Sequence, residues 1–252
     1  MAREYDKKSR FRWDEAKTQF NIHPDIYFKG AYPGTQKIKL DTKKKGVHYK
    51  VDLTIDSIEN GKVPGNGIYG LGREKVGVLI HIPFAKVSGT ITLNGKDHKV
   101  SGMVYMDHTY QSDTAPEIAR RGFRYASLDG SEVGYFLLPR PKKHRGVPMG
   151  YSLKKENGTW VVKKPKSFRG ISSTKKAGGK YLTEVQITFE DGSISTIRHK
   201  KLYDGSSMLK DFSGFTKWAI KKFLGGEIIS YFGEGQLNSD TKVLINQFDN
   251  RY

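Results

Sequence analysis

The sequence predicts an all-β protein of two small antiparallel barrel or sandwich units, with one amphipathic helix near the C-terminus. Three observations predict this class: alternating apolar and polar residues, four two-residue turns, and one segment with helical spacing. The chain has 252 residues, enough for two domains of about 100 to 150 residues each. We expect residues 1–111 to form the first unit, reduced or truncated, and residues 112–252 the second.

Period-two alternation marks the strands. Between residues 49 and 55 the apolar side chains of Tyr49, Val51, Leu53 and Ile55 alternate with polar ones, which places one face on a core and the other in water. Residues 76–84 are apolar enough for burial on both faces. Residues 1–37 look irregular. The first barrel would then have an open edge, which the N-terminal segment or a second copy in a homodimer would cover.

Turn residues separate the strands. Asn-Gly and Asp-Gly pairs tolerate the positive φ angles of tight hairpin turns. Such pairs occur four times: Asn94-Gly95, Asp129-Gly130, Asn157-Gly158 and Asp191-Gly192. The chain therefore reads as a meander of antiparallel hairpins.

One segment, residues 206–224, has helical spacing instead. Its apolar residues recur mostly three and four positions apart, and they are Met208, Leu209, Phe212, Phe215, Trp218, Ala219 and Phe223. We expect Ser206 or Ser207 to cap the start and Gly225-Gly226 to end the helix. The apolar stripe either covers the barrel, the favoured interpretation, or attaches the protein to an anionic membrane surface. The candidate membrane residues are Lys210, Lys217, Trp218, Lys221 and Lys222.

The charge balance limits the partners. Lysine and arginine number 44 against 26 acidic residues, a formal charge of +18. Such a charge attracts phosphates of nucleic acid or of anionic lipid. Nucleic acid is disfavoured because no RNP-type strand, zinc finger or helix-turn-helix pattern occurs. The chain has no cysteine, no apolar run of about 18 residues and no signal-peptide core. As written it is expected in the cytoplasm or at a membrane surface, or exported if an N-terminal segment is missing.

Residues 83–110 carry a family resemblance. The two stretches are Pro83-Phe84-Ala85-Lys86-Val87-Ser88-Gly89-Thr90 and, after the Asn94-Gly95 turn, Val100-Ser101-Gly102-Met103-Val104-Tyr105-Met106-Asp107-His108-Thr109-Tyr110. Together they resemble a signature of the AttH-like and survival-factor-like lipocalins of the calycin superfamily, which are related to carotenoid 1,2-hydratase-type proteins. Phe84, Val104 and Tyr110 depart from that family's usual letters. Residues 124–138 and 231–236 are similar to the opening hairpin and the closing strand of the family's second domain.

The resemblance implies a site where the two domains meet. It points to Asp107 and His108 as catalytic candidates, and to five ligand-binding candidates: Tyr105, Tyr110, Arg124, Tyr135 and Glu234. Asp107 and His108 are adjacent on a predicted strand, so they face opposite sides and cannot form a dyad. An acid here could protonate an isoprenoid alkene if burial kept it neutral. The favoured interpretation is structural, with this pair joining the domains by hydrogen bonds.

Three functions follow, in order of preference. Binding of a lipid, isoprenoid or other hydrophobic ligand is first, because a small antiparallel barrel can enclose one such molecule. An enzyme of the isoprenoid hydratase or cyclase type is the alternative, and electrostatic nucleic-acid binding is third. We expect no cofactor and no metal, since the seven histidines lack metal-site spacing. Residues 65–70 fit G-x-G-x-x-G, but a strand is expected to follow, so we interpret them as a loop.

Overall fold

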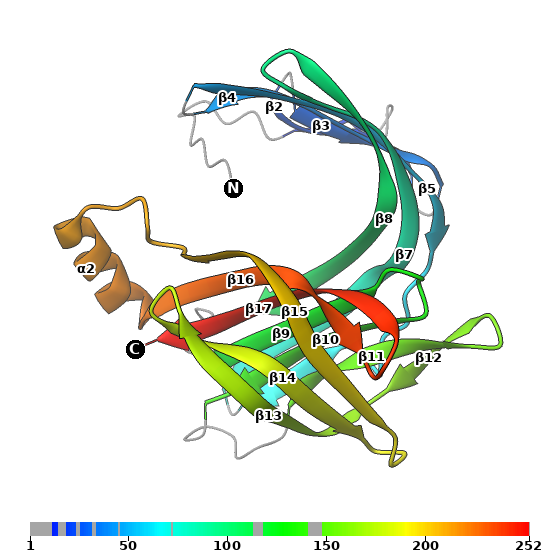
Figure 1. The fold of residues 1–252 in the computed structure, drawn as a ribbon, viewed down its shortest axis with the longest axis vertical. Coiled ribbons are helices and arrows are strands. Elements are labelled where there is room, and N and C mark those ends of the chain that lie inside the picture. Colours follow the sequence, from blue (N-terminus) through cyan, green and yellow to red (C-terminus); the bar gives the residue numbers. More distant parts are fainter. Residues whose placement is uncertain are drawn as a thin grey trace. The chain divides into compact units, whose positions relative to one another are not determined.

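The computed structural model describes residues 12–14, 19–23, 26–31, 34–44, 46–71, 73–112, 118–140 and 148–251. In these ranges the chain forms strands and one α-helix, and every strand pair with a defined register is antiparallel (Figure 1). The predicted all-β class is confirmed. No helix within the described ranges is long and apolar enough to cross a membrane.

The first sheet has eight strands. They follow the order β1-β2-β3-β4-β5-β7-β6, and β8 also pairs with β7. Their bounds are β1 (Arg12–Asp14), β2 (Gln19–His23), β3 (Ile26–Lys29), β4 (Gln36–Lys44), β5 (Val47–Glu59), β6 (Ile68–Leu71), β7 (Glu74–Leu93) and β8 (Lys96–Gln111). The alternation predicted for residues 49–55 lies in β5, where Ile55 is buried.

The second sheet has nine strands and curls strongly (Figure 1). Its order is β12-β11-β10-β9-β17-β16-β15-β14-β13, so that β9 pairs with the last strand, β17. The bounds are β9 (Ala119–Ser127), β10 (Glu132–Pro139), β11 (Met149–Glu156), β12 (Thr159–Lys163), β13 (Pro165–Lys176), β14 (Gly179–Phe189), β15 (Ile194–Ser207), β16 (Glu227–Leu237) and β17 (Thr241–Arg251).

The chain divides into two compact units. Unit 1 comprises residues 1–60 and 84–106, and unit 2 comprises residues 61–83 and 107–252. Strands β7 and β8 therefore each contribute one part to each unit. The boundary expected at residue 111 stays a prediction.

All four predicted turns join paired strands. They connect β7 to β8, β9 to β10, β11 to β12, and β14 to β15. At Asn94-Gly95 and Asn157-Gly158 both residues have positive φ, between 48° and 84°. This is the conformation that two-residue hairpin turns require and that asparagine and glycine tolerate best.

The prediction of an irregular segment over residues 1–37 is wrong for its described part. Strands β1, β2 and β3 lie there and form antiparallel pairs in sequence, and β3 then pairs with β4. Each has only three to five residues. Runs this short are too brief for alternation to be recognised, and their pairing depends on the longer neighbouring strands.

The helix is shorter than predicted. Helix α2 covers Gly214–Leu224, not residues 206–224, because β15 continues to Ser207 in register with Ile229 of β16. Neither Ser206 nor Ser207 caps it; Ser213 occupies the N-cap position without a side-chain cap bond. The predicted end is confirmed, since Gly225 adopts the left-handed conformation (φ 68°) and its N–H bonds to the carbonyl of Lys221.

Unit 2 has a packed apolar core on the inner face of its curled sheet. Phe123 on β9 and Phe136 on β10 are opposite each other in register and fully buried, and Phe168 contacts both rings. The other core members are Tyr125, Leu182, Val185, Ile187, Phe189, Ile197, Leu237, Val243 and Ile245. Side chains therefore occupy the interior in which a ligand was expected.

An ion pair and a hydrogen-bonded histidine are also buried in this core region. Arg121 and Asp249 form an ion pair at 2.6 Å between β9 and β17. His199 of β15 contacts the hydroxyl of Tyr181 at 2.5 Å and the side-chain amide nitrogen of Gln247 at 3.1 Å. Burial lowers the pKa of His199 from 6.5 to about 4, so the ring is neutral at neutral pH.

Candidate functional site

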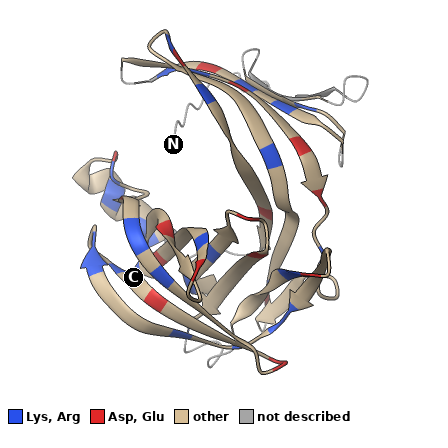
Figure 2. Ribbon diagram, turned by 45° about the vertical axis from the view of Figure 1, so that its right-hand side comes forward, with Lys and Arg blue, Asp and Glu red and all other residues tan. Residues whose placement is uncertain are grey.

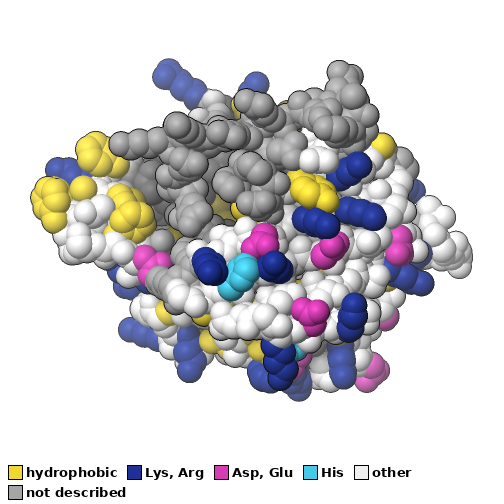
Figure 3. Space-filling model, turned by 90° about the horizontal axis from the view of Figure 1, so that it is seen from above, with side chains coloured by type: hydrophobic (Ala, Val, Ile, Leu, Met, Phe, Trp, Pro, Cys, Tyr) yellow, Lys and Arg dark blue, Asp and Glu magenta, His cyan; other side chains and the backbone are white. Residues whose placement is uncertain are grey.

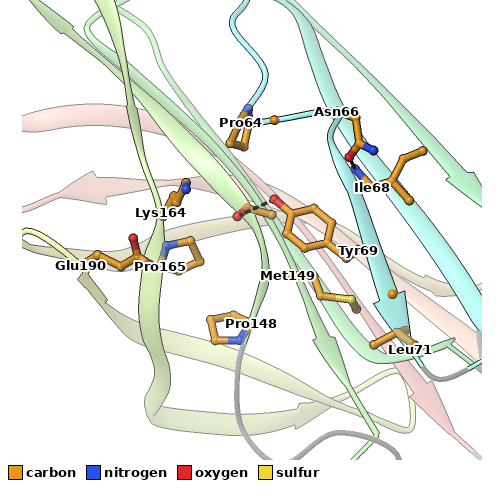
Figure 4. Close-up of a pocket in the computed structure, with 13 residues that line it drawn as sticks. Pro64, Asn66, Ile68, Tyr69, Leu71, Pro148, Met149, Lys164, Pro165 and Glu190 are labelled. Carbon is orange, nitrogen blue, oxygen red and sulfur yellow. Dashed lines mark hydrogen bonds between the residues drawn. The ribbon is translucent and has the colours of Figure 1, made fainter.

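A cleft of about 590 Å³ lies in unit 2 beside β6 (Figure 4). We call it the β6 cleft. Four separate segments line it: Pro64, Gly65, Asn66, Ile68, Tyr69, Gly70 and Leu71; Pro148, Met149 and Gly150; Lys164 and Pro165; and Glu190. Ligand sites in proteins commonly have volumes of about 300 to 1,000 Å³ and mostly apolar walls. The cleft therefore has the size and the lining of a small-molecule site.

The loop before β6 shapes one wall of the cleft. Gly65 and Gly67 both adopt positive φ, and the N–H of Gly67 bonds to the carbonyl of Pro64 at 3.0 Å. The side-chain oxygen of Asn66 accepts a hydrogen bond from the N–H of Ile68 at 3.0 Å. These bonds end the loop and start β6 at Ile68. A strand follows the glycines, so this segment lacks the helix of a dinucleotide-binding motif, as predicted.

Two tyrosines connect β6 and β7 to β11. The hydroxyl of Tyr69 donates to the carbonyl of Gly150 at 3.1 Å, and the hydroxyl of Tyr151 accepts from the N–H of Ile80 at 2.7 Å. Burial raises the pKa of Tyr69 and that of Tyr151, the latter to about 12. Both phenols are therefore protonated at neutral pH, and the Tyr69 proton is directed to the Gly150 carbonyl (Figure 4).

The remaining lining is apolar with a polar rim. Leu71 and Met149 are buried, whereas Ile68 is 47% exposed. Asn66, Lys164 and Glu190 are exposed at the rim. Such a lining suits a hydrophobic molecule with one polar end. Contact between the ligand and the apolar wall removes apolar surface from water, which is favourable, and the rim can hydrogen-bond a hydroxyl or carbonyl of the ligand.

A second polar group lies in unit 2, on the other face of β9 from the core. We call it the Asp107 cluster: Asp107, Thr109, Arg124, Tyr135 and Asn246. Arg124 pairs with Asp107 at 3.0 Å and donates to the Tyr135 hydroxyl at 2.7 Å, with its guanidinium 4.0 Å from the centre of that ring. Thr109 also donates to Tyr135 at 2.8 Å, and Asn246 accepts from Arg124 at 3.4 Å. Burial raises the pKa of Tyr135.

The structure separates the two catalytic candidates. Asp107 is largely buried in its cluster, whereas His108 is exposed and meets the ring of His81 at 6.0 Å. They lie on opposite sides of β8, as the alternation of a strand requires. They therefore cannot act together on one substrate.

The five ligand-binding candidates do not form one site. Arg124 and Tyr135 are in contact, but Tyr110 is 53% exposed on β8 and Glu234 accepts a hydrogen bond from Tyr203 on a different part of the sheet. Tyr105 belongs to unit 1. None of the five lines the β6 cleft. The sequence signal for this cleft is the glycine-rich segment 65–70, whose letters alone indicate only a loop.

The predicted membrane residues lie on or next to α2. Lys210 and Lys222 are exposed, and Trp218 is 57% exposed. Lys217 and Lys221 instead form ion pairs with Glu227 at the start of β16.

Replacing Asp107 with alanine is expected to lower the free energy of unfolding by about 1–3 kcal/mol, because Arg124 loses its carboxylate partner in a largely buried cluster. Urea denaturation followed by circular dichroism measures this change. His108→Ala is the matched control, since it removes the exposed neighbour and should change the stability little. Equal effects of the two substitutions would contradict the structural role of Asp107.

Comparison with known proteins gives matches at the level of structure. No protein-family model matches the chain, and a search of curated proteins finds no similar sequence. A crystal structure assigned as an AttH from Nitrosomonas europaea matches with a TM-score of 0.62 and 14% identity, over 95% of this chain and 74% of that one. Kievitone hydratase from Nectria haematococca matches with a TM-score of 0.50 and 14% identity, over 89% and 70%. At these identities the similarity shows the fold.

Proposed function

Since the chain has the lipocalin-like fold of AttH-type proteins, we propose that it binds a small hydrophobic molecule, such as a lipid or an isoprenoid, in the β6 cleft. The observation that carries the proposal is the cleft of about 590 Å³, whose walls are apolar and whose rim is polar. The packed core of unit 2 supports this location, because side chains already fill the inner face of the curled sheet.

The polar groups suggest how such a ligand is oriented. The apolar body lies along the Tyr69 ring and Met149, and a hydroxyl or carbonyl group meets the rim near Asn66 and Lys164 (Figure 4). Lys164 and Glu190 offer charges of both signs, which favours a neutral polar end over a fully ionised one.

Gly70 provides a direct test. It lines the cleft, and an added Cβ there would meet no heavy atom within 4 Å. Gly70→Leu should therefore fill part of the cleft without disturbing the fold, and should weaken the binding of retinol, a neutral isoprenoid alcohol, by at least about tenfold. Fluorescence titration with retinol measures the affinity.

Gly102→Leu is the matched control, because Gly102 also faces open space on a strand but lies outside the cleft. It should leave retinol binding unchanged. The proposal fails if the wild-type protein binds neither retinol nor the uncharged apolar dye Nile red, or if both glycine variants bind retinol equally well.

A second candidate function is catalysis on a terpenoid or polyene, and the Asp107 cluster is the observation that favours it. A hydratase needs an acid that reaches the alkene. Asp107 pairs with Arg124 and does not line the β6 cleft, so binding without chemistry is the better-supported function. Incubation with farnesol and retinol, followed by mass spectrometry, tests for addition of water. A hydrated product that Asp107→Asn abolishes would favour the enzyme.

A further inference from the structure

Helix α2 exposes its aromatic side chains. Phe215 is 79% exposed, Trp218 57% and Phe223 86%; we call these three residues the α2 patch. The rings of Phe215 and Trp218 contact each other at 5.9 Å, one turn apart. Figure 3 shows hydrophobic side chains gathered on the surface over α2, at the left of the view. A helix in a globular protein normally buries this stripe, so its exposure needs an explanation.

The polar side of the helix is the one that is anchored. Lys217 and Lys221, one turn apart, both form ion pairs with Glu227, whose side chain is only 8% exposed; the Lys217 pair measures 3.0 Å. Ser207 also donates to Glu227, and Arg140 donates to the carbonyl of Gly225 at 3.4 Å. These contacts hold the lysine side of α2 against the sheet. The aromatic side is consequently turned outward.

A basic cleft adjoins the patch. It has a volume of about 460 Å³ and is lined by Trp218, Lys221, Lys222, Gly225, Gly226, Glu227 and Arg251. Its one carboxylate, Glu227, is already shared by two lysines, so Lys222 and Arg251 leave the cleft with a net positive charge. The ammonium of Lys222 lies 5.3 Å from the centre of the Trp218 ring. Basic positions on α2 and the neighbouring strands can be followed in Figure 2.

We propose that α2 docks the protein on an anionic phospholipid bilayer. The α2 patch enters the boundary between headgroups and acyl chains, where tryptophan and phenylalanine are favourable, and the basic cleft receives a headgroup phosphate. The overall charge of +18 attracts the protein to such a surface from a distance.

Charge decides between a membrane and a second copy of the chain. In a twofold dimer built on this patch, both copies of the adjoining basic cleft would lie at the interface. Lys222 and Arg251 would then face like charges, whereas anionic headgroups neutralise them. The positive charge of the cleft therefore disfavours a dimer through this patch and favours an anionic lipid surface.

Co-sedimentation with vesicles tests the proposal. The full chain should bind phosphatidylcholine vesicles that contain phosphatidylglycerol, bind pure phosphatidylcholine vesicles far less, and dissociate as the salt concentration rises. Trp218 emission should shift to shorter wavelength on binding, and Trp218→Phe should remove that shift while binding remains.

Substitutions separate the two parts of the surface. Phe215→Ser combined with Phe223→Ser should weaken binding to the anionic vesicles by about tenfold or more, and Lys222→Glu by about tenfold. All three side chains are exposed, so the thermal midpoint should not change. Lys217→Glu and Lys221→Glu are unsuitable because they would break the anchor at Glu227.

Matched controls lie elsewhere in unit 2. Ile171→Ser with Ile194→Ser removes two exposed apolar residues, and Lys166→Glu reverses one exposed charge; neither should affect binding. Absence of wild-type binding to the anionic vesicles overturns the proposal, as does equal binding to the neutral ones. Sedimentation velocity tests whether a second copy of the chain covers the α2 patch instead. A wild-type dimer that becomes a monomer with Phe215→Ser and Phe223→Ser would also overturn the proposal.

Discussion

Arg121→Ala is expected to lower the free energy of unfolding by about 3–5 kcal/mol, among the largest effects of any single substitution in this chain. The side chains of Arg121 and Asp249 are only 6% and 10% exposed, and their closest atoms are 2.6 Å apart. The second carboxylate oxygen of Asp249 accepts a hydrogen bond from the N–H of Lys180 at 2.7 Å. Removing the guanidinium leaves a buried carboxylate with one backbone donor, which cannot replace the solvation that the charge lost.

The adjacent residue provides the control for this prediction. Arg120 is exposed on the other side of β9, so Arg120→Ala removes the same charge from the sequence without touching the pair. Urea unfolding curves should show a large decrease in the free energy of unfolding for Arg121→Ala. For Arg120→Ala this free energy should change by no more than about 0.5 kcal/mol. A loss below about 1 kcal/mol for Arg121→Ala would show that the pair contributes little.

Lowering the pH from 7 to 4 is expected to remove up to about 3 kcal/mol of stability through His199. The folded pKa is about 4, while the unfolded chain has the ordinary value of 6.5. Below pH 6.5 the unfolded chain therefore binds a proton that the folded chain excludes, so the stability is fully present above 6.5 and falls as the pH approaches 4.

Burial lowers the pKa of His199, and the hydrogen bonds around the ring also leave no acceptor for a second ring proton. The side-chain oxygen of Gln247 accepts from the N–H of Leu182, and its nitrogen donates to the carbonyl of Leu182, which fixes the orientation of the amide. That nitrogen then donates to the Nε2 atom of His199, so Nδ1 carries the ring proton toward Tyr181. A proton on Nε2 would point at the N–H of Gln247, and two donors cannot form a hydrogen bond with each other.

His199→Gln tests this account. The stability difference between wild type and variant should shrink as the pH falls from 6.5 to 4, because only the wild type loses stability through this ring. Guanidinium unfolding at several pH values measures it. His98→Gln, at an exposed position, should follow the wild-type curve. A difference that does not depend on pH would contradict the assignment.

Local signals in the sequence predicted the hairpins, because Asn94-Gly95 and Asn157-Gly158 determine turn geometry within a few residues. The start of α2 could not be predicted in this way. Met208 and Phe212 continue the helical spacing, but pairing of Ser207 with Ile229 keeps the preceding residues in β15. A contact across the sheet thus overrides a local pattern.

The sites were harder to predict than the strands. Arg121 and Asp249 are 128 positions apart, and the β6 cleft is built from segments near residues 64, 148, 164 and 190. No spacing rule connects such positions. The expected ligand site inside a barrel also assumed an empty interior, whereas Phe123, Phe136 and Phe168 fill that of unit 2.

The division of β7 and β8 between the two units affects how this gene could be cut or recombined. A fragment that begins at residue 112 would lack β6 and the first part of β7, and with them Ile80, whose N–H bonds to Tyr151 of β11. Residues 1–60 alone would lack the parts of both strands that belong to unit 1. Neither unit is a contiguous module, so the two are expected to be inherited, expressed and lost together.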